Sequence, residues 1–446
     1  MSKSLIVSSL FGFLVACQFG EEAVDPPASA NAGLPVGSPA GPGGAGPQGP
    51  PLGPAPGQSG GAVQDPSGFP TFHRTPPPPG PTPEGLGTFT APLELSARPG
   101  GGYRPQIAVG ADDRMHVVFY ERAEEGDLIR YRSALPGQAW SAPEPLGFPS
   151  GRNWGPDLVV RSDGSVVLVF DKAEEDFRSR GFLTYRNDGV WTAPEPLTQA
   201  GAFEIGSGHV AHGLGETLAY VYIGKQLGPQ HRFQATGRWL MDGEWQEPVF
   251  FSDGSEDAWH TNVERRPDGS VLIGYDVGRG GAETTLYLVS GREGRFSEPE
   301  NLSRTGAPGE RPHFAFGKDG VDHVTWFHKK GGFPLHVYVR SGQPGQWGEV
   351  HEPSQGIGGY HFDPEIEINE DGVLCLIWGW DGGEDAEMLY SLNRGSGWEA
   401  PRKIADVDWG KPGLASIQAD SAGRFHVVWN QGVRGENAVY YASITP

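Results

Sequence analysis

Histidines in the second half of the sequence have the side-chain type and the spacing to transfer protons. His260, His313 and His361 stand at the start of short apolar runs, and His328 directly follows one, "HVTWF". Imidazole titrates near neutral pH, so it can act as a general acid or base, or bind a metal ion when neutral. His313 and His328 belong to one repeated unit, and we expect them to lie side by side.

Other polar and aromatic residues recur at the same two places of each unit, before its first apolar run and after its second. Their types suit a polar ligand, because carboxylates and arginine bind hydroxyls while aromatic rings stack on sugar rings. The candidates for catalysis are His313, His328, Tyr360 and Arg311. The candidates for ligand binding are Arg104, Glu121, Asp157, Asp171, Trp259, His260, Asn262, Asp276, His361, Asp363, Trp380 and Asp381.

Two alternatives stay open for these positions. The first alternative concerns the polar residue that stands at the start of the first apolar run of each unit. These residues could simply line a narrow channel, whose wall must be polar or hydrated, and need bind no ligand. They are Gln106, Asp157, His209, Asn262, His313, Glu365 and Ser416. The aspartates could also hold a divalent cation such as calcium. No contiguous Asp-x-Asp-x-Asp loop occurs, so no cofactor is assured. By contrast, His116, His323 and His426 recur in mid-strand and are interpreted as packing residues.

A repeat of about 45–52 residues must position these side chains. Each unit contains an apolar run, a turn that is usually Asp-Gly, a run that ends on an aromatic residue, a run with a tyrosine, and an aromatic residue followed by proline. This is typical of four antiparallel strands, the blade of a β-propeller. Because consecutive strands reverse direction, the start of each first strand and the end of each second strand meet at one mouth of the channel.

The repeats number seven, and the last one is incomplete. They begin near Tyr103, Trp154, Ser207, Trp259, Arg311, Asp363 and Leu414. The seventh unit lacks its fourth strand, and "TFTAPLEL" (88–95) has the missing pattern. A strand supplied by the other end of the domain would close the ring and cover an open edge. The sequence therefore predicts an all-β fold, a single seven-bladed propeller at residues 87–446.

The turns near the fourth strands resemble a known motif. "SLNRGSGW" (391–398) has the spacing of the sialidase Asp box, with Asn393 in place of the aspartate, and "SALPGQAW" (133–140) keeps the spacing. Residues 87–446 thus resemble the sialidase-like, or BNR-repeat, β-propellers. The resemblance implies the fold and not the activity, because Asp boxes lie away from the active face. Arg104 could fill the place of one sialidase arginine, but the other two and the Tyr–Glu pair have no counterpart.

The N-terminal part has a different composition. Lys3, the apolar run at residues 5–16 and "LVAC" resemble a bacterial lipoprotein signal. This predicts a signal peptide at 1–16, a lipid on Cys17 and a disordered Pro/Gly-rich spacer through residue 86. The other cysteine, Cys375, lies in an apolar run and is expected to be buried. The protein would be extracytoplasmic and attached to the cell envelope through Cys17.

These observations favour a monomer that binds a glycan or polysaccharide at the channel mouth of blades four to six. The net charge of −21 argues against nucleic acid as a partner. Propeller polysaccharide lyases use His, Tyr and Arg at one mouth to neutralise a uronate and remove its C5 proton. A lyase or glycosidase is therefore the alternative function, and a protein-interaction scaffold is the third.

Overall fold

The computed structural model describes the propeller and leaves out the N-terminal region. It describes residues 88–446 apart from gaps at 97–100, 124–125, 147–154, 174–178, 199–202, 213–216, 227–231, 279–283, 306–308, 330–334, 384, 405–409 and 434–435. The chain divides into two units, Met1–Thr71 and Phe72–Pro446, and every described residue belongs to the second. The predicted signal peptide, lipidated Cys17 and spacer lie outside the described residues.

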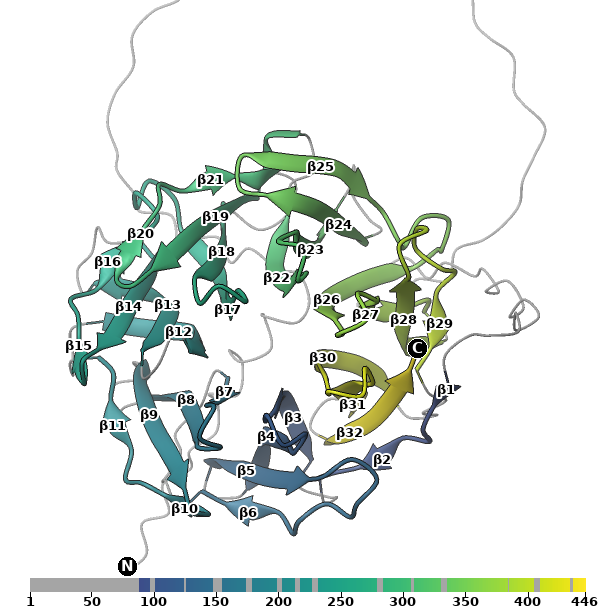
Figure 1. Cartoon of the computed structure of the whole chain (residues 1–446), viewed down its shortest axis with the longest axis horizontal. Helices are drawn as coiled ribbons and strands as arrows, with labels where there is room; N and C mark the ends of the chain where they lie inside the picture. Colours follow the sequence, from purple (N-terminus) through teal and green to yellow (C-terminus); the bar gives the residue numbers. More distant parts are fainter. Residues whose placement is uncertain are drawn as a thin grey trace, which may run out of the picture. The chain divides into compact units, whose positions relative to one another are not determined.

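Seven antiparallel sheets stand around a central axis, which confirms the predicted all-β propeller (Figure 1). Blade one contains β3 (Gly102–Val109), β4 (Met115–Ala123), β5 (Gly126–Ala134) and β6 (Glu144–Pro145). Blade two contains β7 (Asp157–Val160), β8 (Val166–Ala173), β9 (Ser179–Asn187), β10 (Val190–Trp191) and β11 (Glu195–Pro196). Blade three contains β12 (Phe203–His212), β13 (Leu218–Gln226), β14 (Gln234–Met241), β15 (Glu244–Trp245) and β16 (Val249–Phe250).

The second half of the ring has the same order of strands. Blade four contains β17 (Ala258–Arg265), β18 (Val271–Val277), β19 (Thr285–Arg292), β20 (Arg295–Phe296) and β21 (Glu300–Asn301), followed by the 3₁₀ turn η1 (Leu302–Thr305). Blade five contains β22 (Glu310–Phe316), β23 (Asp322–Lys329), β24 (Leu335–Gln343) and β25 (Gln346–His351). Blade six contains β26 (Tyr360–Ile368), β27 (Leu374–Asp381), β28 (Ala386–Asn393) and β29 (Arg402–Lys403).

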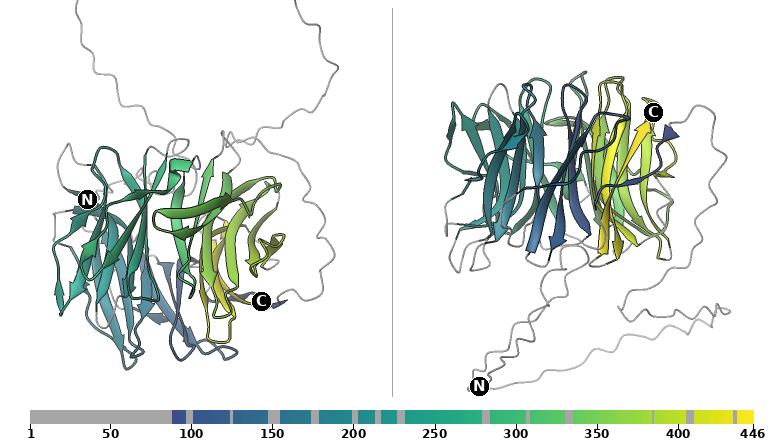
Figure 2. Two further views of the ribbon diagram at one scale, coloured as in Figure 1. Left: turned by 45° about the horizontal axis from the view of Figure 1, so that its top comes forward. Right: turned by 90° about the horizontal axis from the view of Figure 1, so that it is seen from below.

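Blade seven is closed by the N-terminal strand, as predicted. It contains β30 (Lys411–Ala419), β31 (Phe425–Val433) and β32 (Glu436–Thr445), with β1 (Thr88–Phe89) and β2 (Leu93–Glu94) on its outer edge. Thr88 is opposite Thr445, and Leu93 is opposite Tyr441. Figure 1 shows β1 beside the C-terminus, and Figure 2 shows the strands standing side by side across the thickness of the ring.

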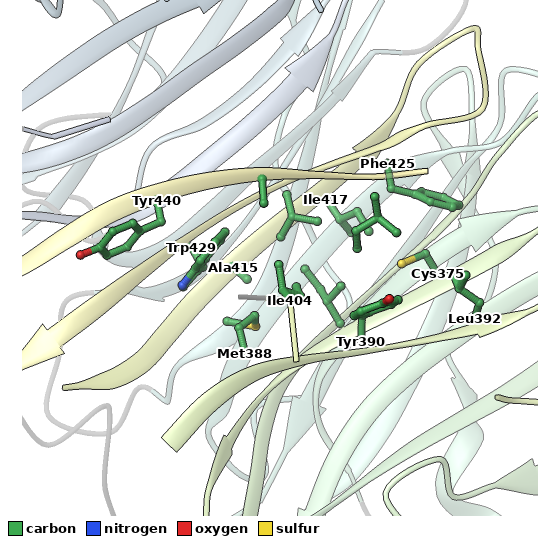
Figure 3. Packing of buried hydrophobic residues seen from close by; sticks show 14 of the residues in the cluster. Cys375, Met388, Tyr390, Leu392, Ile404, Ala415, Ile417, Phe425, Trp429 and Tyr440 are labelled. Carbon is green, nitrogen blue, oxygen red and sulfur yellow. The ribbon is translucent and has the colours of Figure 1, made fainter. Parts of the chain in front are cut away.

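The core lies between neighbouring blades rather than inside one sheet. Between blades six and seven it includes Cys375, Trp429 and Ile404, with Tyr390 and Phe425 beside them (Figure 3). Cys375 is fully buried and has a free thiol, as the apolar run around it predicted. Burial of apolar surface between blades is the main force that holds such a ring together. The packing of the blades in turn fixes the positions of the ends of their inner strands.

Candidate functional site

Six of the seven inner strands are kinked where they enter the mouth of the channel. In six of the seven blades the pairing of the inner strand with its neighbour shifts by one residue near its start, as between Tyr103 and Gln106 in blade one. Arg104, Arg311 and Asp363 stand at this bulge with φ of 52°, 53° and 47°. Such backbone costs about 1–3 kcal/mol per residue and is common near functional sites. The bulges therefore determine which side chains point into the mouth.

A histidine–aspartate pair lies at the mouth of blade four. His260 Nδ1 is 2.9 Å from Asp276 Oδ1, and the backbone N–H of Arg311 donates to the same oxygen over 3.3 Å. The Asp276 side chain is only 1% exposed, whereas that of His260 is 27% exposed. A buried carboxylate that accepts the Nδ1 proton fixes the neutral ring in the tautomer with an unprotonated Nε2. The pair can therefore orient a proton acceptor at the mouth.

An ion pair joins the bulges of blades five and six. Arg311 Nη1 donates to Asp363 Oδ1 over 2.5 Å, and both side chains are mostly buried. Charge-assisted bonds of this kind are stronger than neutral ones. Together with the backbone bond to Asp276, this pair links three predicted ligand-binding residues and the predicted catalytic residue Arg311 into one group, His260–Asp276–Arg311–Asp363. We call this group the mouth cluster.

A second layer of polar side chains lies below the mouth cluster, in the column predicted to line the channel. His313 Nδ1 is 2.7 Å from Asn262 Nδ2 and 2.9 Å from Glu365 Oε2. The nitrogen can accept the amide proton or donate to the carboxylate, but one proton position excludes the other. Asp157 and His209 make a similar contact of 3.4 Å in blades two and three. These bonds around the ring fit the channel-lining interpretation of this column.

Asp171 lies on the other side of the mouth and is 1% exposed. Its Oδ1 accepts a long bond of 3.4 Å from the Tyr220 hydroxyl, and its Oδ2 accepts none from the described residues. Burial raises the pKa of Asp171 to about 7, against the opposing effect of the nearby charges of His209 and Arg104. Asp171 therefore titrates near neutral pH.

The three aromatic candidates differ in how far their side chains are exposed. Trp259 is 36% exposed, and its Nε1–H donates to the carbonyl of Gly278 over 2.6 Å. Trp380 is 5% exposed, donates to the carbonyl of Gly358 and packs in the core between blades five and six. Tyr360 is half-buried, and burial raises the pKa of its hydroxyl. Trp259 is thus the most exposed of the three rings.

His361 is part of the core and not of the mouth, which differs from the role expected for it. It is fully buried, Trp378 Nε1–H donates to its Nδ1 over 2.9 Å, and its Nε2 is 3.2 Å from the carbonyl of Ile357. Burial lowers the pKa of His361 to about 4. Both ring nitrogens are engaged in structural bonds, so we remove His361 from the candidate site.

The strand register also does not place His313 beside His328, where it was expected. His313 lies opposite Thr325, three residues before His328 on β23, so the side chains at 325 and 328 leave opposite faces of the strand. His328 is 5% exposed and lies opposite His336. The structure therefore brings His313 together with Asn262 and Glu365, and leaves His328 in the body of blade five.

The two remaining candidates form ion pairs with basic side chains. Glu121 accepts from Arg130 over 2.8 Å, and Asp381 is 2.5 Å from Lys411 Nζ. No group of three His, Cys, Asp or Glu side chains in the described part of the chain has the geometry to hold a metal ion. Calcium binding at the mouth therefore gains no support from these residues.

Sequence reasoning missed two glutamates that lie deeper in the channel. Glu264 and Glu367 follow Asn262 and Glu365 by two residues on their strands and so face the same way. Enclosure by the wall, with nearby carboxylates, raises the pKa of Glu367 to about 8 and that of Glu264 well above its usual range. The alternation of polar residues in "HTNVER" and "DPEIEI" is the signal that could have found them.

Comparison with known proteins extends the fold assignment. No family model matches the chain, and a search of curated proteins finds no match. Among solved structures, an ulvan lyase of a new polysaccharide lyase family, bound to -[GlcA(1-4)Rha3S]-, is 12% identical, with 80% of this chain and 93% of that chain covered and a TM-score of 0.53. A Penicillium chrysogenum α-L-arabinanase complexed with arabinobiose is 12% identical over 80% and 98% of the chains, with a TM-score of 0.50.

A third similar structure, a protein of unknown function from Dyadobacter fermentans, is 13% identical over 81% and 99% of the chains, with a TM-score of 0.52. At these identities the likeness shows the fold alone, a seven-bladed β-propeller. The predicted resemblance therefore holds at the level of the fold. Among the described residues, no helix has the length and apolar character needed to cross a membrane.

Proposed function

We propose that the mouth formed by blades four to six binds a carbohydrate. The observation that carries the proposal is Trp259, a half-exposed ring whose orientation is fixed by its bond to Gly278 and which directly precedes His260 of the mouth cluster. A partly exposed aromatic ring one residue from the imidazole of the mouth cluster suits a sugar, which has an apolar face and a rim of hydroxyls. The carbohydrate-active proteins that share the fold support a site of this kind.

Binding of Trp259→Ala to a glycan array and by calorimetry tests this proposal. We expect the substitution to weaken binding by roughly tenfold or more, because an exposed aromatic anchor contributes about 1.4 kcal/mol or more. Phe250→Ala is the matched control, since Phe250 is equally exposed at 36% but lies on the outer strand β16. A wild-type protein that binds no glycan, or a Trp259→Ala variant that binds as well as Phe250→Ala, would contradict the proposal.

The His260–Asp276 pair favours an enzyme as the second candidate function. In a lyase or glycosidase, His260 would accept a proton from the substrate or from water, and Asp276 would hold its tautomer. This assigns the base to His260 rather than to His313 or His328. Screening of polysaccharides for released ends, followed by His260→Ala and Asp276→Asn, tests the assignment. We expect both variants to lose at least a hundredfold in kcat, whereas unchanged turnover in His260→Ala would exclude it.

We also propose that the protein is held outside the cytoplasm by a lipid on Cys17, as the N-terminal sequence predicts. A lipid anchor followed by a Pro/Gly-rich spacer would let the propeller reach extended glycans. Metabolic labelling with a palmitate analogue in a bacterial host tests this point. The full chain should be labelled and Cys17→Ser should not be; equal labelling of both would contradict it.

A further inference from the structure

The chemical class of the glycan can be argued from the charges at the mouth, and the inference rests on the proposed function. The mouth cluster, the polar layer below it and Asp171 contribute five carboxylates to the described part of the wall: Asp157, Asp171, Asp276, Asp363 and Glu365. The same wall contains two permanent cations, Arg104 and Arg311. With neutral imidazoles the wall has three more negative charges than positive ones, or two more when Asp171 is protonated.

The two arginines already face carboxylates of the protein. Arg311 is bonded to Asp363 over 2.5 Å, and Arg104 lies near enough to Asp171 to oppose the rise of its pKa. The next cation outward, Lys411, is 2.5 Å from Asp381. An anionic sugar would have to compete with these partners and would leave a buried carboxylate without its cation, which is costly.

The histidines can at most cancel this excess of negative charge. His209, His260 and His313 each lie within 3.4 Å of a carboxylate. If all three were protonated and all five carboxylates ionised, the charges would only cancel. Glu264 and Glu367 lie deeper, and each proton that they lose adds a negative charge to the channel.

A uronate or sulfate would therefore meet repulsion at this mouth. The excess negative charge repels an anionic group at close range, and the net charge of −21 adds long-range repulsion of polyanions. Carboxylates accept hydrogen bonds well from sugar hydroxyls, and the Asn262 amide and the imidazoles can donate or accept. The wall thus offers many acceptors for hydroxyl groups and little uncompensated positive charge.

We propose that the ligand of this mouth is an uncharged, hydroxyl-rich glycan and not a polyanionic one. An uncharged ligand also favours a glycosidase over a lyase. A lyase of the uronate type needs a substrate carboxylate at the mouth, whereas a glycosidase acting on a neutral chain does not.

Matched polysaccharides that differ only in charge test the inference by calorimetry or affinity electrophoresis at pH 7.5. The panel contains neutral arabinan, xylan, galactomannan and β-glucan, and polygalacturonate alongside its fully methyl-esterified form. We expect binding to one or more uncharged members, and at least tenfold weaker binding of polygalacturonate than of its ester. Tighter binding of the charged form would overturn the inference and leave the proposed function intact, whereas no binding to any member would overturn both.

Asp363→Asn provides the second test, because it frees Arg311 from its carboxylate. We expect this variant to bind polygalacturonate at least severalfold more tightly than the wild type does. Glu370→Gln is the matched control, since it also removes one negative charge but lies in the β26–β27 hairpin at the opposite face and is 59% exposed. Equal polygalacturonate binding by Asp363→Asn and Glu370→Gln would contradict the role given to the Arg311–Asp363 pair. Thermal melting of both variants checks that they are folded.

Discussion

At the scale of single residues, the local environment decides which of several similar side chains can do chemistry. His260 lies inside the bulge of its inner strand, is partly exposed and is bonded to Asp276, while His361 is paired before the bulge of its own strand, is fully buried and is bonded to Trp378. Both histidines stand near the start of an inner strand in the sequence. Their places relative to the bulge separate a candidate proton acceptor from a packing residue.

His361→Leu should therefore lower stability without changing ligand binding. The substitution leaves the Trp378 Nε1–H and the Ile357 carbonyl without their partner, and an unsatisfied buried polar group costs about 1–3 kcal/mol. Urea denaturation measures the loss. His351→Leu is the control, because His351 is an exposed residue of β25, and it should change the free energy of unfolding by less than about 0.5 kcal/mol. A loss of glycan binding by folded His361→Leu would contradict this view.

Glu367 predicts a pH dependence of stability whose sign can be stated. Its pKa is about 8 in the folded protein and 4.5 as a free side chain. The folded state therefore binds the proton more tightly, and the stability from this group is lost as pH rises from about 4.5 to 8. Glu367→Gln should remove this decline and be more stable than the wild type at pH 8, by ~1–3 kcal/mol.

Urea denaturation at pH 5.5 and pH 8 makes the comparison. Glu370→Gln should keep the wild-type pH dependence, because Glu370 is 59% exposed. If Glu367→Gln and the wild type lose stability in parallel between the two pH values, Glu367 is not protonated in the channel.

At the scale of elements, the strands could be predicted from the sequence and the contacts between blades could not. Each repeat carries its own apolar runs, turns and aromatic residues, so the seven blades and the closing strand are readable from one chain. In blade five the phrase "QWGEVH" also forms a strand, Gln346–His351. The Arg311–Asp363 bond joins residues 52 positions apart, and no local pattern specifies it.

The inner-strand bulge explains the errors at the site. A bulge inserts one residue and changes the face that the side chains on its far side occupy. In blade six the shift falls between Phe362 and Glu365. The alternation of side chains between the two faces of the strand is therefore not continuous across it. The strand pattern alone therefore predicts a channel-lining place for Glu365, beyond the shift, but could not place His361, before it.

The closing strand gives a prediction at this scale with its own internal control. Leu95 is 1% exposed and packs in the core of blades one and seven, whereas Leu93, two residues earlier, is 48% exposed. Leu95→Ala should lower the free energy of unfolding by about 2–4 kcal/mol, and Leu93→Ala should change it by less than about 0.5 kcal/mol. Equal effects in a denaturation experiment would mean that the N-terminal strand does not seal blade seven.

At the scale of the whole propeller, the ring brings seven inner strands together at one mouth and concentrates their side chains there. The closing strand lies on the outer edge of blade seven, away from the inner strands (Figure 1). The stabilising contacts lie between blades. Substitutions at the mouth can therefore change its charge and shape without removing the contacts that hold the ring together. This agrees with the variety of carbohydrate-active proteins that share the fold at 12% identity.

The central claim is that a sugar lies on Trp259 beside the mouth cluster. A crystal structure of the propeller with the neutral oligosaccharide that binds most tightly tests it most directly. We predict a sugar ring stacked on Trp259, with hydroxyls within hydrogen-bonding distance of His260 or Asp363. An oligosaccharide bound on the outer rim or at the opposite face, with the mouth empty, would contradict the account.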